Sequence, residues 1–399
     1  MGRTVTGDGA VHLDRAMSIL RRQPIIDGHN DLPWAARVAA DYDLTVLDLT
    51  DTEDETHTDL RRLRAGHVGA QFWSVWVPPD LADDGALVAT LEQIDFVHQM
   101  IAAYPDDFVL AVGTDDVTAA QATGRIACLL GAEGGHSIGG SLGALRTLFM
   151  LGVSYLTLTH NKNVPWADSA TDVPAAHGLT QFGREVIGEM NRLGMLVDLS
   201  HVSPETMDAA LDVSDAPVIF SHSSCRALVD HPRNVPDAIL SRLRENGGMC
   251  MVSFVPEFVS VECHAWSVRL DEYVRHRMDD PGDRDTRERV RQEFIRLEPQ
   301  PRATLRQVAD HIEHARAIAG VDGVGIGGDY DGSPDFPEDL PDVSAYPALF
   351  AELVARGWSD AECELLAGGN VLRVMRAAHA EAERLAFERR PVRIRADES

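Results

Sequence analysis

Histidines and carboxylates recur directly after short apolar runs of the chain. His29 and Asp31 lie two residues apart in the motif DGHND. Residues i and i+2 of an extended segment project to the same face, so both side chains could bind one metal ion. A turn in which the two side chains only form hydrogen bonds is the alternative interpretation.

Two further histidines end matching motifs. His201 closes DLSH and His222 closes IFSH, each after a β-rich run. One buried histidine is usually a satisfied polar group, but two at equivalent strand ends, together with His29, approach the set of ligands that zinc favours. This pair therefore favours metal binding.

Glu133 follows the apolar run IACLLGA and precedes two glycines. A carboxylate there is costly to bury without a cation or hydrogen-bond donors, and its two oxygens can bridge two metal ions. A buried ion pair is the alternative. His160 ends TLTH and Asp329 lies in GGDYDG, each again at the end of a β-rich run.

Eight β-rich runs carry or precede these residues, and helical or polar segments separate the runs. They span 24–27, 72–77, 126–133, 154–160, 195–201, 216–222, 248–254 and 323–329. Near-continuous apolar runs are typical of parallel strands that are buried on both faces. The alternation over 399 residues predicts an α/β fold, a (β/α)₈ TIM barrel formed by residues 1–399 as a single domain.

The C-terminal ends of the strands of such a barrel meet at one mouth, where active sites of this fold lie. The barrel would bring together seven residues: His29, Asp31, Glu133, His160, His201, His222 and Asp329. Burying so many titratable groups without a function would cost stability. The sequence therefore predicts a metal site at the C-terminal ends of the strands.

The segment between the last two predicted strands is longer than one crossover helix needs. We expect a charged helical insertion at about 256–304, between strands 7 and 8. Its middle is dense in charges of both signs, which is typical of exposed helix. A solvated helical excursion is one interpretation, and a lid over the barrel mouth is the other.

The composition excludes several classes of partner. The chain has 36 Lys and Arg against 63 Asp and Glu, a net charge of −27, which would repel nucleic acid and anionic membranes. Its five cysteines are widely spaced without a C-x-x-C, so a disulfide frame is not expected. No apolar stretch suits a signal peptide or a membrane span, and we expect a cytoplasmic protein.

Seven motifs resemble the membrane dipeptidase family, peptidase family M19, of the amidohydrolase-like metal barrels. In the family's order they are DGHNDLPW (27–34), GAEGGHSIGG (131–140), LTLTHNKNVPWADSA (156–170), LVDLSHVSPETM (196–207), IFSHSSCRAL (219–228), PRNVPD (232–237) and GIGGDYDG (325–332). The resemblance covers nearly the whole chain. It implies a binuclear centre with two Zn²⁺ ions per chain and a bridging hydroxide as the nucleophile, and a homodimer.

The resemblance also implies a role for each motif residue. The metal ligands would be His29 and Asp31 for one zinc, His201 and His222 for the second, and Glu133 for both. Asp329 corresponds to the acid/base residue, His160 to the group that stabilises the tetrahedral oxyanion, and Arg233 to the residue that binds the substrate's terminal carboxylate. Asp329, His160 and Glu133 would thus be catalytic, and His160, Arg233 and Asp329 would contact the substrate.

We therefore expect a zinc-dependent dipeptidase that hydrolyses L,L and L,D dipeptides. Arg233 also makes independent sense, because a guanidinium matches a free peptide carboxylate bidentately. Another hydrolase of this barrel, acting on a cyclic amide, a lactone or a β-lactam, is one alternative. A phosphate-binding isomerase or aldolase, suggested by the Gly-rich GVGIGG, and a non-catalytic relative are the others.

Three features depart from the family pattern. The cysteines that bridge chains or loops in the secreted animal members are not matched, since Lys162 stands where one would be expected. Val255 stands where animal members carry a tyrosine near the substrate, and the insertion after it is longer than the family leads us to expect. Because of these departures, the resemblance does not predict the substrate preference or the oligomer contact of this protein.

Overall fold

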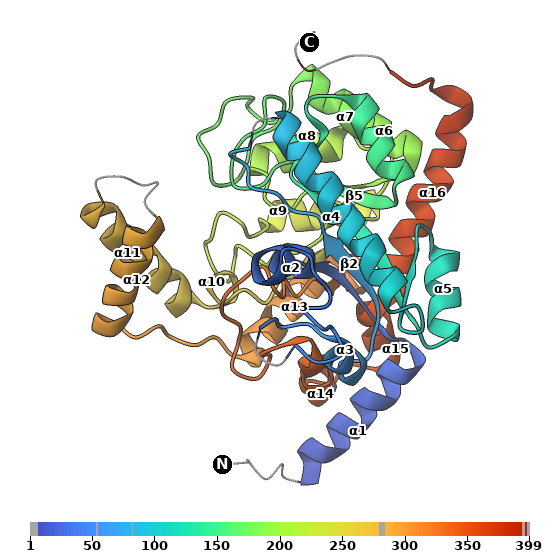
Figure 1. The fold of residues 1–399 in the computed structure, drawn as a ribbon. Helices are drawn as coiled ribbons and strands as arrows, with labels where there is room; N and C mark the ends of the chain where they lie inside the picture. Colours follow the sequence, from blue (N-terminus) through green and yellow to red (C-terminus); the bar gives the residue numbers. More distant parts are fainter. Residues whose placement is uncertain (1–6, 53–54, 82, 279–283, 393–395, 397–399) are drawn as a thin grey trace.

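Parallel strands form the centre of the molecule (Figure 1). The computed structural model describes residues 7–52, 55–81, 83–278, 284–392 and 396. In this part of the chain the strands are β1 (Ile25–Asn30), β2 (Val68–Ser74), β3 (Phe108–Leu110), β4 (Ile126–Glu133), β5 (Val153–Thr157), β6 (Leu196–Asp198), β7 (Ile219–Phe220), β8 (Met249–Val252) and β9 (Val324–Ile326).

Eight of the described strands close into the barrel that the sequence predicts. The hydrogen-bonded order is β2-β1-β9-β8-β7-β6-β5-β4, and the pairing of β2 with β4 closes the ring. Every residue of β1, β2 and β4 is buried. This burial on both faces is what the near-continuous apolar runs indicate.

Several strands are shorter than the predicted runs, such as β6 (Leu196–Asp198) against 195–201 and β7 (Ile219–Phe220) against 216–222, and two further details differ. The second barrel strand begins at Val68 and not at Phe72, because Gly69 and Gln71 interrupt the apolar run that the sequence pattern relies on. The short strand β3 was not predicted. It pairs with the first three residues of β4, whereas β5 pairs with the last four, so β3 extends the sheet outside the closed ring.

Helices surround the barrel (Figure 1). They are α1 (Gly7–Arg22), α2 (Leu32–Ala40), α3 (Leu60–Ala65), α4 (Asp83–Ala103), α5 (Thr114–Ala122), α6 (Leu142–Met150), α7 (Gln181–Leu193), α8 (Pro204–Val213), α9 (Asp237–Asn246), α10 (Pro256–Val259), α11 (Val261–Arg277), α12 (Arg284–Leu297), α13 (Leu305–Ala319), α14 (Tyr346–Ala355), α15 (Asp360–Glu364) and α16 (Asn370–Glu388). Short 3₁₀ or π turns are η1 (Gly135–Ile138), η2 (Val321–Gly323), η3 (Val343–Ala345) and η4 (Leu365–Gly369). Among the described residues, no helix has both the length and the apolar character needed to cross a bilayer.

Local sequence sets where the helices begin and end beside the site. Thr180 precedes α7, and its side chain accepts a hydrogen bond from the Gly183 N–H. Gly194 ends the same helix with φ at 81°, a backbone conformation that favours glycine. Ser203 caps α8 in the same way as Thr180 caps α7, with Pro204 in the first turn. The end of α7 at Gly194 fixes where the chain enters β6. The cap at Ser203 fixes where the chain leaves the turn after β6 and begins α8.

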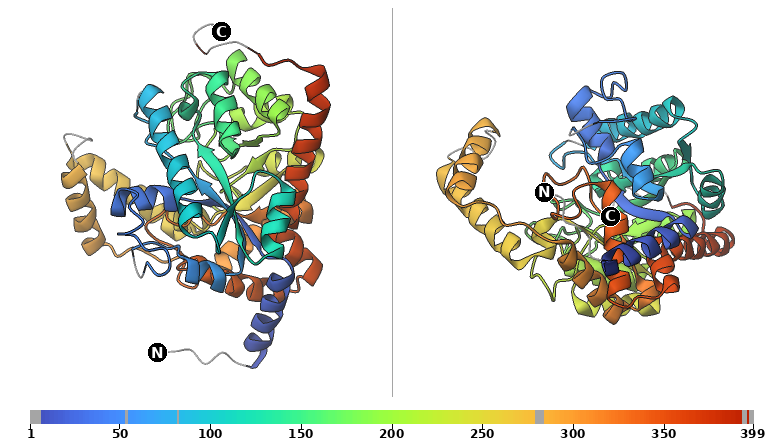
Figure 2. Two further views of the ribbon diagram at one scale, coloured as in Figure 1. Left: turned by 45° about the vertical axis from the view of Figure 1, so that its right-hand side comes forward. Right: turned by 90° about the horizontal axis from the view of Figure 1, so that it is seen from below.

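The predicted insertion at 256–304 contains α10, α11 and α12, and its residues 279–283 lie outside the described residues. Helices α11 and α12, which we call the arm, stand away from the barrel in both views of Figure 2. They pack on each other through a small apolar core of Trp266, Leu270, Val274, Val290 and Phe294. The arm therefore has a core separate from that of the barrel.

This separate core generates a stability prediction. Trp266 is 3% exposed, and its indole N–H donates to the Glu298 carbonyl at 3.0 Å. Trp266→Ala should cost the arm about 3 kcal/mol or more of local stability. Hydrogen exchange should become faster in 261–277 and 284–297 and stay unchanged in the barrel strands. A large fall in the melting temperature of the barrel would contradict the independence of the arm.

Candidate metal centre

The predicted site residues lie at the C-terminal ends of the barrel strands or in the loops that follow them, with Arg233 in the loop between β7 and α9. They surround one cavity of about 900 Å³, whose wall includes Asp31, Glu133, His160, His201, His222, Arg233 and Asp329. His29, at the end of β1, is fully buried behind this wall. The fold therefore brings together every site residue that the sequence predicts.

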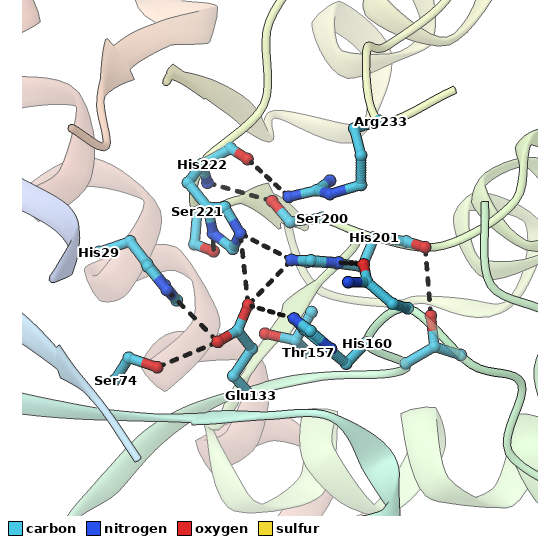
Figure 3. A network of polar contacts seen from close by, with 12 residues as sticks. His29, Ser74, Glu133, Thr157, His160, Ser200, His201, Ser221, His222 and Arg233 are labelled. Carbon is cyan, nitrogen blue, oxygen red and sulfur yellow. Dashed lines mark hydrogen bonds and ion pairs between the residues drawn. The ribbon is translucent and has the colours of Figure 1, made fainter. Parts of the chain in front are cut away.

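Glu133 at the end of β4 lies at the centre of the group (Figure 3). Its Oε1 is 2.9 Å from His201 Nε2 and 3.4 Å from His222 Nε2. Its Oε2 is 3.5 Å from His29 Nε2, which is itself 3.2 Å from Asp31 Oδ2. Oε1 thus faces His201 and His222, whereas Oε2 faces His29 and accepts a hydrogen bond from Ser74 at 3.2 Å.

The side-chain atoms that could hold a metal form three overlapping groups, each within 4.8 Å. The groups are His29, Glu133 and His222; Glu133, His160 and His201; and His29, Asp31 and Asp329. Two of these His/Glu clusters share Glu133, which is consistent with a binuclear metal site. Histidine nitrogens combined with carboxylate oxygens suit zinc and other divalent transition metals.

Hydrogen bonds on the outer side of two rings fix their tautomers. His222 Nδ1 is 2.8 Å from Ser221 Oγ, whose own proton goes to Asp198, so His222 Nδ1 must donate. His201 Nδ1 is 3.2 Å from Asn161 Oδ1, which only accepts. Each Nε2 therefore carries a lone pair, and the two Nε2 atoms face each other at 3.0 Å. Two lone pairs that meet in this way fit a cation between them.

The same reasoning applies to His29. Its Nδ1 is 2.8 Å from the Tyr155 hydroxyl, which donates to the Gly28 carbonyl, so His29 Nδ1 is the donor. The lone pair on Nε2 then faces Asp31 and Glu133, and Nε2 has no hydrogen-bond partner among the described residues. His29, Asp31 and Glu133, whose Oε2 also accepts a hydrogen bond from Ser74 at 3.2 Å, together attract positive charge, either a metal ion or a proton on His29.

The pKa values agree with this need. Burial lowers the pKa of His201 and of His222 well below the ordinary value, which leaves neutral rings. Burial also lowers the pKa of His29, but Tyr155, Glu133 and Asp31 outweigh it and raise that pKa well above the ordinary value. Burial raises the pKa of Glu133, but His29 and the other histidines lower it well below the ordinary range. The centre therefore favours an ionised Glu133 and attracts positive charge.

Asp329 lies beside this centre. Burial raises its pKa well above the ordinary value, and Asp31 and Glu133 add to the effect while His29 and Arg233 oppose it. Its backbone has φ at 65°, and that of His201 has φ at 68°, conformations that cost a non-glycine residue energy. Such strain is often found where a side chain must be aimed at a site.

Space around Asp329 is limited as well. A methyl group on Gly332 would overlap the carboxylates of Asp31 and Asp329. Only glycine therefore lets the chain after β9 pass so close to the two carboxylates.

His160 and Arg233 complete the inner wall of the cavity. His160 Nε2 is 3.9 Å from Glu133 Oε1, and burial lowers the pKa of His160 to about 4. Arg233 is 3% exposed and donates to the His222 carbonyl at 3.3 Å and to Ser223 Oγ at 3.5 Å. No carboxylate of the described residues lies within ion-pair distance of its guanidinium. The cavity therefore holds a buried cation that forms no ion pair with the described side chains, although the charges of Asp329 and Glu133 act on it.

Two buried aspartates support the centre and were missed in the sequence. Asp27 accepts hydrogen bonds from the backbone of His29 and Gly328, which ties β1 to β9. Asp198 accepts from Thr157 and Ser221 at 2.6 Å each, which ties β6 to β5 and β7. The sequence did contain a signal for these two residues: an aspartate inside an apolar strand needs hydrogen-bond donors, and this need indicates a structural role. Tyr155, Asn161 and Ser221, which orient the histidine rings, carried no such signal.

Comparisons with known proteins assign the family. Residues 13–389 match the family model described as membrane dipeptidase, peptidase family M19. Dipeptidase 3 of Mus musculus is 40% identical over 377 residues, which cover 93% of this chain and 68% of the mouse protein. Dipeptidase 3 of Rattus norvegicus is also 40% identical, with the same coverage.

Solved structures show the same fold. The probable dipeptidase PvdM of Pseudomonas aeruginosa superposes with a TM-score of 0.80 at 24% identity, covering 93% of this chain and 99% of that one. A metallopeptidase of Rhodobacter sphaeroides, liganded with a phosphinate mimic of the dipeptide L-Ala-D-Ala, superposes with a TM-score of 0.73 at 23% identity. The superposition covers 89% of this chain and 99% of that one. The chain thus belongs to the membrane dipeptidase family, peptidase family M19, and is a metallopeptidase of the dipeptidase type.

Proposed function

We propose that this metallopeptidase uses two zinc ions to hydrolyse the peptide bond of dipeptides with free termini, both L,L and L,D. The observation that carries the proposal is the position of Glu133, whose two oxygens face separate ligand pairs. His29 and Asp31 would hold one ion, His201 and His222 the other, and Glu133 both. Metal ions held there supply Lewis acidity and lower the pKa of water.

The protein's own residues would orient the dipeptide and move its protons. Arg233 would bind the terminal carboxylate of the substrate through its guanidinium fork. The substrate would thereby supply the ion-pair partner that the Arg233 side chain lacks among the described residues. His160, at 3.9 Å from Glu133, would stabilise the oxyanion that forms at the scissile carbonyl. Asp329, in its ionised form, would accept a proton from the attacking water and pass it to the leaving amine, a transfer for which a raised pKa is suited.

The substrate class follows from the same residues. A free carboxylate opposite Arg233 favours a dipeptide over a cyclic amide or a lactone, which carries no such group. The phosphinate mimic bound by the Rhodobacter sphaeroides metallopeptidase supports the L,D class. Family membership speaks against the phosphate-binding isomerase or aldolase that GVGIGG also suggested.

Asp329→Asn separates proton transfer from metal binding. The amide keeps the size of the side chain but cannot act as a base, so kcat on dipeptides should fall at least about 100-fold. Metal content, measured by elemental analysis, should stay that of the wild type. Asp335→Asn on the same segment is the matched control and should leave kcat unchanged. Loss of metal from the Asp329→Asn variant would instead show that Asp329 is a metal ligand.

Arg233→Ala tests the carboxylate contact. Loss of a buried charge-assisted hydrogen bond costs about 1.5–3 kcal/mol, so kcat/KM for dipeptides with a free carboxylate should fall at least about tenfold. C-terminally amidated dipeptides should be affected less. Arg233→Lys, which keeps the charge but loses the fork, should recover part of the loss. An equal loss on free and amidated substrates would show that Arg233 is structural.

A further inference from the structure

The substrate cavity extends past the metal centre to the arm. Its wall includes His264, Ser267, Val268 and Asp271 of α11, besides the site residues at the strand ends. Cavities of about 300–1,000 Å³ hold drug-sized ligands, so a cavity of about 900 Å³ has room beyond the backbone of a dipeptide. The arm therefore forms part of the surface that a substrate side chain meets.

Helical spacing explains which residues of α11 face the cavity. Positions 264, 267, 268 and 271 follow the i, i+3, i+4, i+7 pattern of one helix face. The positions on the other face, Trp266, Leu270 and Val274, pack in the apolar core with α12. The packing of one face thus holds the other face toward the cavity.

A continuous polar wall joins this face to Arg233. The Arg233 backbone N–H donates to His231 Nδ1 at 3.1 Å, and the His231 ring lies 4.9 Å from that of His264. Glu257, just before the arm, lies with Oε1 4.0 Å from His231 Nε2, and its other oxygen accepts from Ser267. The charge of Glu257 also acts on Arg233, so a residue whose carboxylate binds Arg233 would lie near Glu257.

The charge of this wall is negative. Glu257 and Asp271 form no ion pair with an arginine or lysine within the described ranges. Burial lowers the pKa of His231 to about 3, so His231 adds no positive charge at neutral pH. Arg287 of α12 also lines the cavity and adds one positive charge to the two negative ones. The three charged residues Glu257, Asp271 and Arg287 therefore give the arm side of the cavity a net charge of −1.

We propose that Glu257 and Asp271 form an acidic subsite that binds a cationic side chain on the C-terminal residue of the dipeptide. The inference rests on the proposed function, because Arg233 is what places that residue beside the arm. The insertion then selects substrates with a C-terminal lysine or arginine. The barrel residues perform the hydrolysis, and the arm sets the preference.

Two substrates of nearly equal shape test the subsite. Ala-Lys and Ala-norleucine of the same stereochemistry differ at the side-chain end by the ammonium group. The wild type should favour Ala-Lys in kcat/KM by about fivefold, the size expected for a partly exposed ion pair. The preference should shrink in 1 M salt, which screens such pairs. In the double variant Glu257→Gln, Asp271→Asn, the ratio of kcat/KM for Ala-Lys to that for Ala-norleucine should fall to about one.

Glu272→Gln is the control, because Glu272 is exposed on α11 and does not line the cavity. It should keep the wild-type ratio. Hydrolysis of both dipeptides at equal rates by the wild type would overturn the acidic subsite alone. Failure to hydrolyse either dipeptide in the zinc-loaded enzyme would overturn the proposed function and the subsite with it. A ratio that is unchanged in the double variant would also overturn the subsite.

Discussion

The structure depends on the concentration of electron-pair acceptors around Glu133. Three histidine Nε2 atoms and the oxygens of Glu133 and Asp31 meet at distances of 2.9–3.5 Å, where each would repel the others without positive charge between them. Burying such a group is costly, and divalent cations are the partners that its donor atoms suit. The barrel places these buried acceptors at the mouth where its eight strand ends converge.

A second layer of residues keeps the acceptors in place. The Ser221 hydroxyl donates its hydrogen bond to Asp198, so His222 Nδ1 must donate to Ser221, and the lone pair of His222 Nε2 is left to face Glu133. Tyr155 does the same for His29. Outer hydrogen bonds of this kind set the tautomer and the orientation of metal-binding histidines. The arm, with its own apolar core, has no part in this arrangement and can vary without disturbing it.

Much of the barrel and its site could be predicted, because local sequence patterns determine where the strands and their ends lie. Apolar runs that end in His, Glu or Asp locate the strand ends, and barrel closure then places His29, Glu133 and His222 together. The weaker signals were missed for physical reasons. Gly69 and Gln71 hide the start of β2, and three residues of β3 are too few to form a pattern. The side chains that orient the rings, such as Asn161, come from loops whose path depends on tertiary contacts.

The direction of the arm was equally beyond prediction. Its charge density indicated exposed helix, which is what α11 and α12 are, but the choice between a solvated excursion and a lid needed the structure. The face of α11 at His264 and Asp271 lines the cavity while the rest of the arm stands away from the barrel. Neither alternative alone describes this wall beside the substrate cavity.

The most direct test of the central claim is a crystal structure with anomalous difference maps recorded on both sides of the zinc absorption edge. Two peaks are predicted, one on each side of Glu133. The first should be bound by Glu133 Oε1 with His201 and His222, and the second by Glu133 Oε2 with His29 and Asp31. A protein that hydrolyses dipeptides but shows one peak or none, or peaks held by other residues, would contradict the account.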